Sequence, residues 1–418
     1  MENTPKSLRL HLMVAGRINA GKSTLFNLIS GQDAAITSPE RGTTTDVVEK
    51  TMELRPLGPV VLLDTAGTDD DSALGNQRGE RTDRALDRAD AVLLVVNANE
   101  WGEPEETLLS RAKARKIPVI PVVNRRGGPA TEAFRSFLRT ATGVPALEVC
   151  AAAAGERSAF LDRLAGVLPT VLPGEAAAPP LLRDLVGPGA LVVLMTPIDP
   201  QAPRGRLILP QVQAIRDALD GDAIAVTAKE NAFPRIYGEL SRRPDLVVCD
   251  SQAVGVMTAT TPDGVPQTTF SILMARMKGD LDTLAAGCAA IPSLRPGDRV
   301  LIAESCTHHA GDDDIGRVKI PRLLEKTVGG KLAVTVSSGF DWPQNLEQYR
   351  LIVHCGGCML NRRAMLNRLR AAEARGVAVT NYGMCISCCT GVLETVLSPF
   401  PSALREYRAA LDKNRSGV

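Results

Sequence analysis

The chain has few aromatic residues and almost no net charge, and both shortages exclude classes of function. Of its 418 residues, 8 are Phe, 4 Tyr and 2 Trp, too few for a platform on which successive bases stack. Lys and Arg number 48 against 47 Asp and Glu, a formal net charge of +1. Without a basic excess there is no electrostatic case for nucleic acid or an anionic membrane as a partner.

Long apolar runs are also missing. No run approaches the ~18 residues that suggest a membrane-spanning helix, and the opening residues MENTPK lack the charged-then-apolar layout of a signal peptide. We therefore predict a cytoplasmic protein without membrane contact, in a compartment that keeps thiols reduced. The remaining composition is that of an ordinary globular protein.

Cysteine and histidine, by contrast, are concentrated in one part of the chain. Six of the nine cysteines and three of the four histidines lie between residues 306 and 389. In a reducing compartment such a concentration favours metal or redox chemistry over disulfides.

The length predicts about two to four domains, and the hydrophobic pattern divides the chain into three segments: 1–172, 181–278 and 280–418. In the first, short apolar runs alternate with helical patterns, which predicts an α/β fold with a mainly parallel sheet. A linker, PGEAAAPP, follows at 173–180. The strands expected are Leu8–Ala15, Val60–Leu63, Ala91–Asn97, Pro118–Val123 and Ala146–Cys150, and the helices include Lys22–Ile29 and Thr131–Thr142.

The second and third segments also mix strand and helix patterns. Expected strands are Ala190–Met195, Ile224–Thr227, Leu246–Cys249, Gly255–Thr260, Arg299–Ala303, Leu332–Ser337, Leu351–His354 and Val377–Thr380. Expected helices are Gln211–Leu219, Asp282–Ala290, Leu360–Ala374 and Ser402–Leu411. Asp263-Gly264, between two β-rich stretches, is a hairpin signal.

A phosphate-binding loop stands at the amino terminus. Residues 16–23, GRINAGKS, fit the pattern G-x-x-x-x-G-K-[ST] after an apolar strand and before a helix. Backbone N–H groups of such a loop surround phosphate oxygens at a helix amino end. The nucleotide-binding residues expected here are Gly16, Asn19, Ala20, Gly21, Lys22, Ser23 and Thr24, with Lys22 on the β/γ-phosphates and Ser23 on Mg²⁺.

Two further motifs complete a nucleoside-triphosphatase site. Asp64-Thr-Ala-Gly67 follows a predicted strand, as the Asp on the metal side and the Gly that senses the γ-phosphate should. Thr43, Thr44 and Thr45 lie between the two motifs, and Thr44 is our choice for the hydroxyl that reaches Mg²⁺. The catalytic set is therefore Lys22, Thr44, Asp64 and Gly67.

Together these motifs resemble the Era/TrmE branch of the translation-factor-related GTPases, with Asn19 in the phosphate loop and a G-T-T-x-D-like segment at 42–46. In that branch the Asn helps to hold a K⁺ ion that replaces an arginine finger. The resemblance thus implies slow GTP hydrolysis with Mg²⁺, stimulated by K⁺.

The guanine-recognition motif departs from that pattern. The family has Asn-Lys-x-Asp, whereas this chain has Asn124-Arg-Arg-Gly127. The missing Asp would accept hydrogen bonds from guanine, and its loss costs about 2–3 kcal/mol, which weakens the preference for GTP. Cys150-Ala151 stands where the family has a Ser-Ala loop that contacts the base.

Two Cys/His groups follow predicted strands, at the sheet edge where α/β folds bind ligands. They are Cys306-Thr-His308-His309 and His354-Cys355-Gly-Gly-Cys358. Three thiolates could hold zinc or an iron–sulfur cluster. One Cys-x-x-Cys pair plus a single Cys fits a [4Fe–4S] cluster with an open fourth position better than a closed zinc site; three unrelated buried cysteines are the alternative.

A GTPase segment followed by these two groups resembles the HydF family of [FeFe]-hydrogenase maturation GTPases. The stretches that support the resemblance are 197–199, 202–211, 314–321, 354–362 and 380–383. It implies a P-loop GTPase domain (1–172), a dimerisation domain (181–278) and an α/β iron–sulfur cluster domain (280–418), in a homodimer.

The same resemblance implies the cofactors and partners. Cys306, Cys355 and Cys358 would hold a [4Fe–4S] cluster, with His354, His308, a carboxylate such as Asp199 or a non-protein ligand in the fourth position. The protein would receive a diiron precursor from two radical-SAM maturases and deliver the 2Fe subcluster to apo-[FeFe]-hydrogenase, with GTP regulating partner exchange.

Several other residues are interpreted as structural. We expect core packing for Cys385, Cys388 and Cys389, a solvated turn for Asp312–Asp314 with Asp314 starting a helix, a charged helix face for Arg362-Arg363, and a satisfied sheet position for His11. Loop capping is our first interpretation of Asp199.

Two other functions stay open. One is an Era/TrmE-like GTPase that acts on the ribosome or tRNA, which the low charge and scarce aromatics oppose. The other is a zinc-stabilised, GTP-regulated adaptor without a biosynthetic role.

Overall fold

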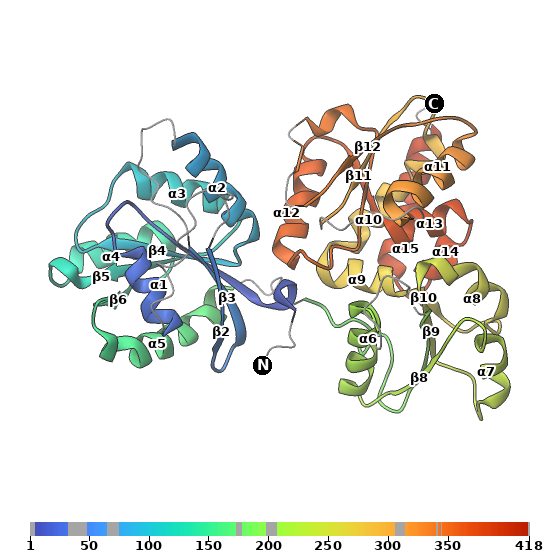
Figure 1. Cartoon of the computed structure of the whole chain (residues 1–418), viewed down its shortest axis with the longest axis horizontal. Helices are drawn as coiled ribbons and strands as arrows, with labels where there is room; N and C mark the ends of the chain where they lie inside the picture. The colour runs from blue at the N-terminus through green and yellow to red at the C-terminus, as the bar shows by residue number, and fades with distance from the viewer. Residues whose placement is uncertain are drawn as a thin grey trace. The chain divides into compact units, whose positions relative to one another are not determined.

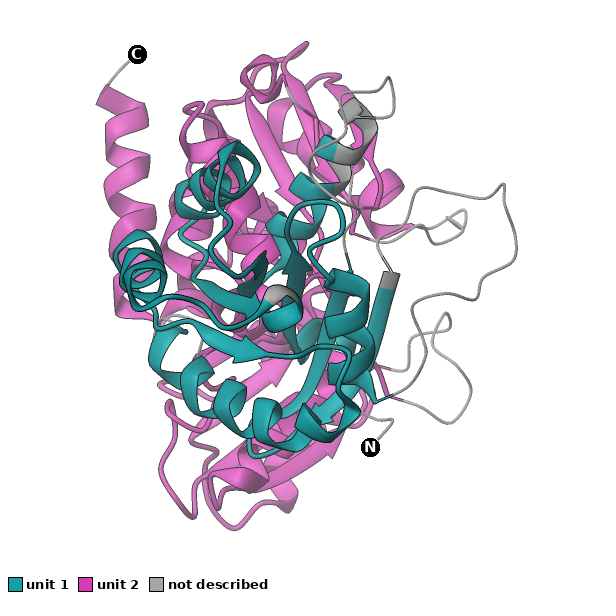
Figure 2. Cartoon of the chain, turned by 90° about the vertical axis from the view of Figure 1, so that its left-hand side faces the viewer, with its two compact units in different colours: residues 1–177 teal, residues 178–418 magenta. Residues whose placement is uncertain are grey.

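The computed structural model describes residues 5–31, 48–64, 75–172, 178–197, 207–305, 314–339, 342–343 and 345–416. It divides into two compact units, residues 1–177 and 178–418 (Figure 2). The candidate site residues Thr44, Gly67, Asp199, Cys306, His308 and His309 lie outside the described residues. Within the described part of the chain, no helix is long and apolar enough to cross a membrane.

Unit 1 is built on a six-stranded sheet in the order β2-β3-β1-β4-β5-β6 (Figure 1). All neighbours are parallel except β2 and β3. The strands are β1 (Leu10–Ala15), β2 (Val48–Leu54), β3 (Gly58–Asp64), β4 (Ala91–Asn97), β5 (Val119–Asn124) and β6 (Leu147–Val149). The helices are α1 (Lys22–Ser30), α2 (Gly75–Arg88), α3 (Glu103–Ala114), α4 (Glu132–Thr142) and α5 (Arg157–Val171).

Both faces of this sheet are buried. Leu12 and Val14 of β1 pack in one apolar cluster with Phe26 and Phe160, whereas the intervening residue Met13 packs in a second cluster with residues of α2 and α3. Successive side chains of a strand point to opposite faces, so the two clusters lie on opposite sides of the sheet. This confirms the predicted parallel sheet covered by helices on both faces.

Unit 2 contains two four-stranded sheets in which every neighbouring pair is parallel. The first has the order β10-β9-β7-β8, from β7 (Leu191–Met195), β8 (Ile224–Ala228), β9 (Leu246–Cys249) and β10 (Gln267–Thr269). The second has the order β12-β11-β13-β14, from β11 (Arg299–Ala303), β12 (Ala333–Ser337), β13 (Leu351–His354) and β14 (Ala378–Asn381). A single apolar cluster includes residues of both sheets.

The helices of unit 2 are α6 (Leu209–Asp220), α7 (Phe233–Glu239), α8 (Val254–Thr260), α9 (Phe270–Lys278), α10 (Leu281–Cys288), α11 (Ile320–Val328), α12 (Arg362–Glu373), α13 (Tyr382–Cys389), α14 (Leu393–Leu397) and α15 (Pro401–Ser416) (Figure 1). Helix α9 is absent from the sequence predictions. It begins after Thr269, whose Oγ1 accepts a hydrogen bond from the backbone N–H of Ile272 at 3.2 Å.

The predicted strand Gly255–Thr260 is wrong, because these residues form helix α8. Val254 and Met257, three positions apart, are its buried residues, which is a helical and not an alternating pattern. The predicted hairpin at Asp263-Gly264 is wrong too, since β10 runs parallel to β9. Gly264, with φ +80°, instead lies between α8 and β10.

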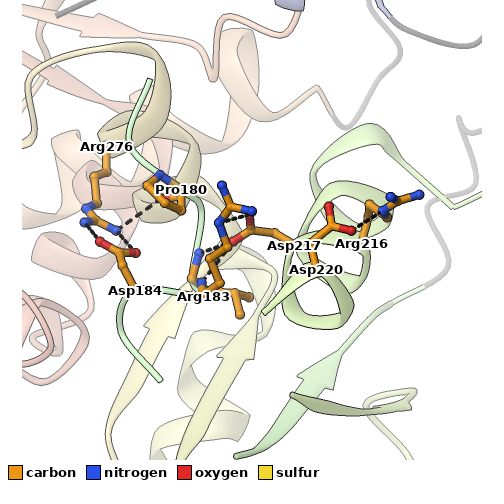
Figure 3. A network of polar contacts seen from close by, with 8 residues as sticks. Pro180, Arg183, Asp184, Arg216, Asp217, Asp220 and Arg276 are labelled. Atoms are coloured by element: carbon orange, nitrogen blue, oxygen red, sulfur yellow. Dashed lines mark hydrogen bonds and ion pairs between the residues drawn. The ribbon is translucent and has the colours of Figure 1, made fainter. Parts of the chain in front are cut away.

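The segment through which the chain enters unit 2 bends at 181–182 and turns at 183–185, and polar contacts hold it (Figure 3). Asp217 of α6 accepts hydrogen bonds from the backbone N–H groups of Leu182 at 2.8 Å and Arg183 at 2.9 Å. Arg276 of α9 forms an ion pair with Asp184 and donates to the carbonyl oxygen of Pro180 at 3.2 Å. Residues 180–184 are therefore held by two helices of the unit.

Candidate functional site

The loop between β1 and α1 has the backbone that phosphate binding requires. Gly16 and Gly21 have φ of +151° and +96°. A Cβ at Gly16 would lie 2.3 Å from the carbonyl oxygen of Val95, and one at Gly21 would lie 2.2 Å from Nδ2 of Asn124. Both positions therefore need glycine, and the loop leads directly into the amino end of α1, where backbone N–H groups bind anions.

Lys22 and Asp64 lie at this same end of the sheet. The Lys22 ammonium donates to the carbonyl oxygen of Arg17 at 2.6 Å, so the side chain spans the loop. Asp64 ends β3 and pairs in register with Val14, next to the start of the loop. The residues proposed to hold Mg²⁺ and phosphate in the described part of the chain thus share one edge.

Asn124 connects the phosphate loop to the predicted base-contacting loop. Its Nδ2 donates to the carbonyl oxygen of Ala20 at 3.1 Å, and its Oδ1 accepts from the N–H of Ala151 at 3.3 Å. The side chain is buried. The two loops that sequence reasoning assigned to phosphate and base are therefore joined through one amide.

Arg125, at the lysine position of the guanine motif, is also held in place. It forms an ion pair with Glu156, whose second oxygen accepts from the N–H of Cys150 at 3.1 Å. The Cys150 N–H and the Arg125 guanidinium hold the pKa of the Glu156 carboxyl below its usual range. The loop at 150–151 is thereby fixed to the guanine motif on a second side.

A contact that the sequence analysis missed ties the phosphate loop to α3. Arg17 donates through Nε and Nη2 to the two oxygens of Glu105, at 2.7 and 2.5 Å, and it also pairs with Glu100. The hydrogen bonds that the Glu105 carboxylate accepts raise the pKa of the Arg17 guanidinium. Eighty-eight residues separate Arg17 and Glu105, and no local motif marks the pair.

The second candidate site lies where β11 and β13 end. Cys355 follows β13, and its N–H donates to the carbonyl oxygen of Ala303 at 2.8 Å. Its Sγ accepts from the backbone N–H groups of Ser305 at 3.2 Å and Gly357 at 3.4 Å. Two backbone N–H groups therefore point at the sulfur of this candidate metal ligand.

Only one of the two glycines between Cys355 and Cys358 is required by the backbone. Gly357 has φ +61°, and a Cβ there would lie 2.5 Å from Cε of Met365. At Gly356 a Cβ would meet nothing within 4 Å. The conformation that presents both cysteines therefore depends on Gly357.

His354 is not available as the fourth cluster ligand, which corrects one of the candidates above. Its Nε2 lies 2.9 Å from Nη1 of Arg368 and its Nδ1 lies 2.7 Å from the carbonyl oxygen of Cys355. Because Arg only donates, Nε2 accepts and Nδ1–H donates, so both ring nitrogens are used. Burial and the Arg368 charge lower the pKa of His354 to about 3.

An ion pair between a buried carboxylate and an exposed arginine joins the two residues that flank the segment containing Cys306. Glu304, just before that segment, pairs with Arg317, just after it, at 2.8 Å between Oε2 and Nη2. Asp314 Oδ1 accepts from the N–H of Arg317 at 2.8 Å, which confirms that Asp314 caps the start of the next helical stretch.

Lys278 of α9, which the sequence analysis also missed, contacts the cysteine loop. Its Nζ donates to the carbonyl oxygens of Gly357 at 2.9 Å, Cys358 at 3.2 Å and Leu360 at 2.9 Å. Burial lowers the pKa of Lys278 to about 8, while the Cys358 and Cys355 thiols act in the opposite direction.

Of the residues that we expected to have structural roles, the cysteines near the end of the chain and His11 do as predicted, and two arginines do not. Cys385 is buried, and Cys388 and Cys389 pack against the same apolar cluster, so the predicted core packing is confirmed. His11 is a satisfied sheet residue, as predicted: its Nδ1 lies 2.8 Å from the carbonyl oxygen of Arg9. The charged face expected of Arg362-Arg363 is wrong.

The two arginines fail that prediction for different reasons. Arg363 is only 5% exposed. Arg362 directs its guanidinium at backbone carbonyl oxygens at the end of α9, at 2.7 to 3.2 Å. The Arg362 guanidinium, which we expected to face solvent, is therefore bound by the carbonyl oxygens at the carboxyl end of α9, where the helix dipole favours a positive charge.

Within the described residues, no group of three or more Cys, His, Asp or Glu side chains could hold a metal ion. Cys306, the third predicted thiol ligand, lies outside them. Cys355 and Cys358 nevertheless fit a cluster site in their chemistry, because they share one tight loop and two N–H groups point at the Cys355 sulfur.

Comparison with protein families gives three matches along the chain. Residues 181–279 match the hydrogen maturase F dimerization domain, and residues 282–399 match the hydrogen maturase F tetramerization domain. Residues 11–125 match the 50S ribosome-binding GTPase family. Together the first two matches cover most of unit 2.

Individual relatives match only the GTPase part. The tRNA modification GTPase MnmE of Legionella pneumophila (strain Paris) is 41% identical over 119 residues, 28% of this chain and 26% of that protein. GTPase Der of Deinococcus deserti is 36% identical over 126 residues, 30% of this chain and 28% of that protein. The chain thus spans about a quarter of the length of the curated relatives it matches.

Solved structures are more distant. A point variant of Aquifex aeolicus Era bound to GDP·AlF4⁻ has a TM-score of 0.32 and 17% identity, covering 79% of this chain and 94% of that one. The G domain of the T. maritima FeoB iron transporter has a TM-score of 0.28 and 22% identity, covering 38% of this chain and 99% of that one.

Proposed function

This chain belongs to the hydrogen maturase F family, and we propose that it is a GTPase, with GTP and Mg²⁺ bound at the phosphate loop, that acts as a scaffold for hydrogenase maturation. In this proposal it receives a diiron precursor from radical-SAM maturases and transfers the 2Fe subcluster to apo-[FeFe]-hydrogenase. One observation carries the proposal. The loop that contains Cys355, whose Sγ accepts hydrogen bonds from two backbone N–H groups, lies in the same chain as a complete phosphate loop.

We propose Cys306, Cys355 and Cys358 as the ligands of a resident [4Fe–4S] cluster. When bound, such a cluster supplies an iron with an open position that cargo can occupy. Since His354 uses both ring nitrogens, the candidates for the fourth position are His308, Asp199 and a non-protein ligand.

In this proposal GTP hydrolysis regulates partner exchange and does not supply the chemistry of transfer. Lys22 would bind the β/γ-phosphates, Ser23, Thr44 and Asp64 would act on the Mg²⁺ side, and Gly67 would sense the γ-phosphate. Asn19, whose φ of +63° places it in the left-handed region of the loop, would help to hold K⁺. Equal turnover in KCl and NaCl would contradict the K⁺ hypothesis.

The family domains indicate an oligomer, and we propose three functional regions: GTPase (1–172), dimerisation (181–278) and cluster binding (280–418). The two sheets of unit 2 fall one into each of the last two regions. In this arrangement each sheet has its own exposed edge strand, β8 and β12, for contacts between protomers.

Anaerobic iron, sulfide and zinc analysis tests the cluster. We expect about four irons per chain, lost in Cys355→Ser and Cys358→Ser but kept in the matched control Cys389→Ser, with GTP hydrolysis unchanged in all three. One zinc per chain without sulfide would instead support a zinc-stabilised adaptor.

Transfer of the diiron unit needs its own assay. The protein loaded with diiron precursor is added to apo-[FeFe]-hydrogenase, and hydrogen evolution is measured against the Cys358→Ser variant. The similarity to MnmE, confined to 28% of the chain, makes a tRNA- or ribosome-directed GTPase the alternative. A colourless, iron-free protein after anaerobic purification would favour that alternative.

A further inference from the structure

Helix α9, which is not part of the sheet that contains β13, holds the cysteine loop, residues 355–360. Residues 355–360 come after β13, yet Lys278, at the carboxyl end of α9, reaches them across about 80 residues of sequence. The family matches place the two parts in different domains, since α9 ends within the dimerization match and the loop lies within the tetramerization match.

Lys278 donates three hydrogen bonds to the cysteine loop. The Lys278 ammonium has three N–H donors, and the carbonyl oxygens of Gly357, Cys358 and Leu360 lie 2.9 to 3.2 Å from Nζ. These carbonyls belong to the turn that separates the two cysteines and to the residues just after it. One ammonium thereby fixes the direction of three peptide groups around Cys358.

The contact is reciprocal. Arg362, the first residue of α12 and two positions after Leu360, donates through Nη1 to the carbonyl oxygens of Met277 at 2.8 Å and Gly279 at 2.7 Å, on either side of Lys278. Each of the two segments thus contributes one cationic side chain, Lys278 or Arg362, that donates hydrogen bonds to backbone carbonyl oxygens of the other segment.

Lys278 is in addition almost completely buried, with 2% of its surface exposed. Burying an ammonium is unfavourable unless polar groups replace its water shell. An apolar side chain such as Met would fill the same space without that cost, so packing alone does not explain a lysine here. Its charge and its donors are both directed at the loop.

We propose that Lys278 is a positioning residue for the cluster: it holds the 355–360 loop in the conformation that presents Cys355 and Cys358, and its positive charge raises the reduction potential of the cluster bound there. The inference rests on the proposed function for the cluster itself. Its first part concerns the loop of the metal-free protein and stands independently.

The first test uses the metal-free, full-length protein. Hydrogen exchange is followed by mass spectrometry on a peptide covering 355–361, which includes the N–H of Leu360 bonded to Gly357 and that of Cys355 bonded to Ala303. Lys278→Met should exchange in this peptide at least roughly tenfold faster than the wild type, because its three hydrogen bonds are lost. Lys331→Met, which removes an exposed lysine paired with Glu325, should exchange there as the wild type does.

The second test separates charge from hydrogen bonding in the cluster-loaded protein. Lys278→Gln keeps N–H donors without the charge, so its loop should exchange more slowly than that of Lys278→Met. Both variants should shift the midpoint potential of the cluster to more negative values, since a nearby positive charge favours the reduced form. GTP hydrolysis should stay unchanged, because Lys278 lies in unit 2.

The two measurements test the positioning role and the electrostatic role of Lys278 separately. Wild-type exchange in the 355–361 peptide of Lys278→Met overturns the positioning role, and an unshifted potential in both variants overturns the electrostatic role. If Lys278→Met does not fold, the same measurements on Lys278→Gln decide. A wild-type protein without iron contradicts the proposed function, whereas the exchange result on the metal-free chain still decides the role of Lys278 in the loop.

Discussion

The side-chain amide of Asn124 donates a hydrogen bond to the backbone carbonyl oxygen of Ala20 at 3.1 Å, across 104 residues of sequence. Asn124 is therefore part of the phosphate loop as well as of the guanine motif. Because the same amide accepts from the N–H of Ala151, a change at this residue acts on both ends of the nucleotide.

Asn124→Ala should consequently weaken nucleotide binding and stability together. The substitution leaves two buried backbone groups without their partner, at a cost of about 2 kcal/mol in the free energy of unfolding. GTP and GDP affinity, measured with a fluorescent analogue, should fall at least roughly tenfold. Asn124→Asp retains the acceptor for Ala151 but loses the donor to Ala20, so an Asp variant that matches the wild type would contradict this role.

Gly127→Asp should sharpen guanine recognition. The pattern of the related GTPases has Asp at this position, where it accepts hydrogen bonds from the base. Its return should favour GTP over ITP, which lacks the exocyclic amino group, by about 2 kcal/mol or more, roughly thirtyfold in the ratio of dissociation constants. The wild type should bind the two nucleotides with similar affinity. A wild type that already discriminates strongly would show that other residues read the base.

Local motifs predicted much of this molecule. The phosphate loop and the cysteine pair follow strands and precede helices, and Asp64 ends a strand, so spacing alone placed all three at strand ends. Sequence could not distinguish helix from strand at 255–260, because this short run, GVMTAT, with β-branched residues at alternate positions, fits both. It also could not find Lys278 or the Arg17–Glu105 pair, since their partners lie about 80 to 90 residues away.

His354 shows a second limit of prediction from sequence, which does not reveal the hydrogen-bond partners of a side chain. Composition makes His354 an obvious metal ligand, because it directly precedes Cys355. Which nitrogen is free depends on Arg368, fourteen residues away on α12, and on the carbonyl oxygen of Cys355. Only the folded arrangement shows that neither nitrogen is available.

Gly357→Ala should cost the protein its iron, whereas Gly356→Ala should not. Alanine at φ +61° is strained by about 1–2 kcal/mol, and its Cβ would also displace Met365. At Gly356 neither problem arises. Iron content after anaerobic reconstitution compares the two variants, and equal iron in both would show that the loop tolerates another backbone conformation.

Ile224→Lys should disrupt the dimer that we propose for residues 181–278. Among the described strands, β8 lies at the edge of its sheet and pairs with β7 alone, and Ile224 is 53% exposed. An exposed apolar edge strand is a ready partner for a second chain. Light scattering after size exclusion should show monomers for Ile224→Lys. Val336→Lys, on the edge strand β12 within the tetramerization match, should leave dimers but no tetramers. Unchanged mass in both variants would place the interfaces elsewhere.

The stability of unit 1 should fall as the pH is lowered from about 6.5 to about 4. Burial and the Arg88 charge lower the pKa of His11 to about 4 in the folded chain, against about 6.5 when unfolded. In this window the unfolded chain binds a proton that the folded chain does not, so acid favours unfolding, by up to about 1.4 kcal/mol per pH unit.

The contribution of His11 is therefore complete above pH 6.5 and lost below about pH 4, where both states are protonated. Urea unfolding followed by Trp101, in a Trp342→Phe background that leaves one tryptophan in the chain, measures it. His11→Gln keeps a donor for the carbonyl oxygen of Arg9 but does not titrate. Its free energy of unfolding should depend less on pH across this window, and an identical slope in both proteins would mean that other groups govern the acid sensitivity.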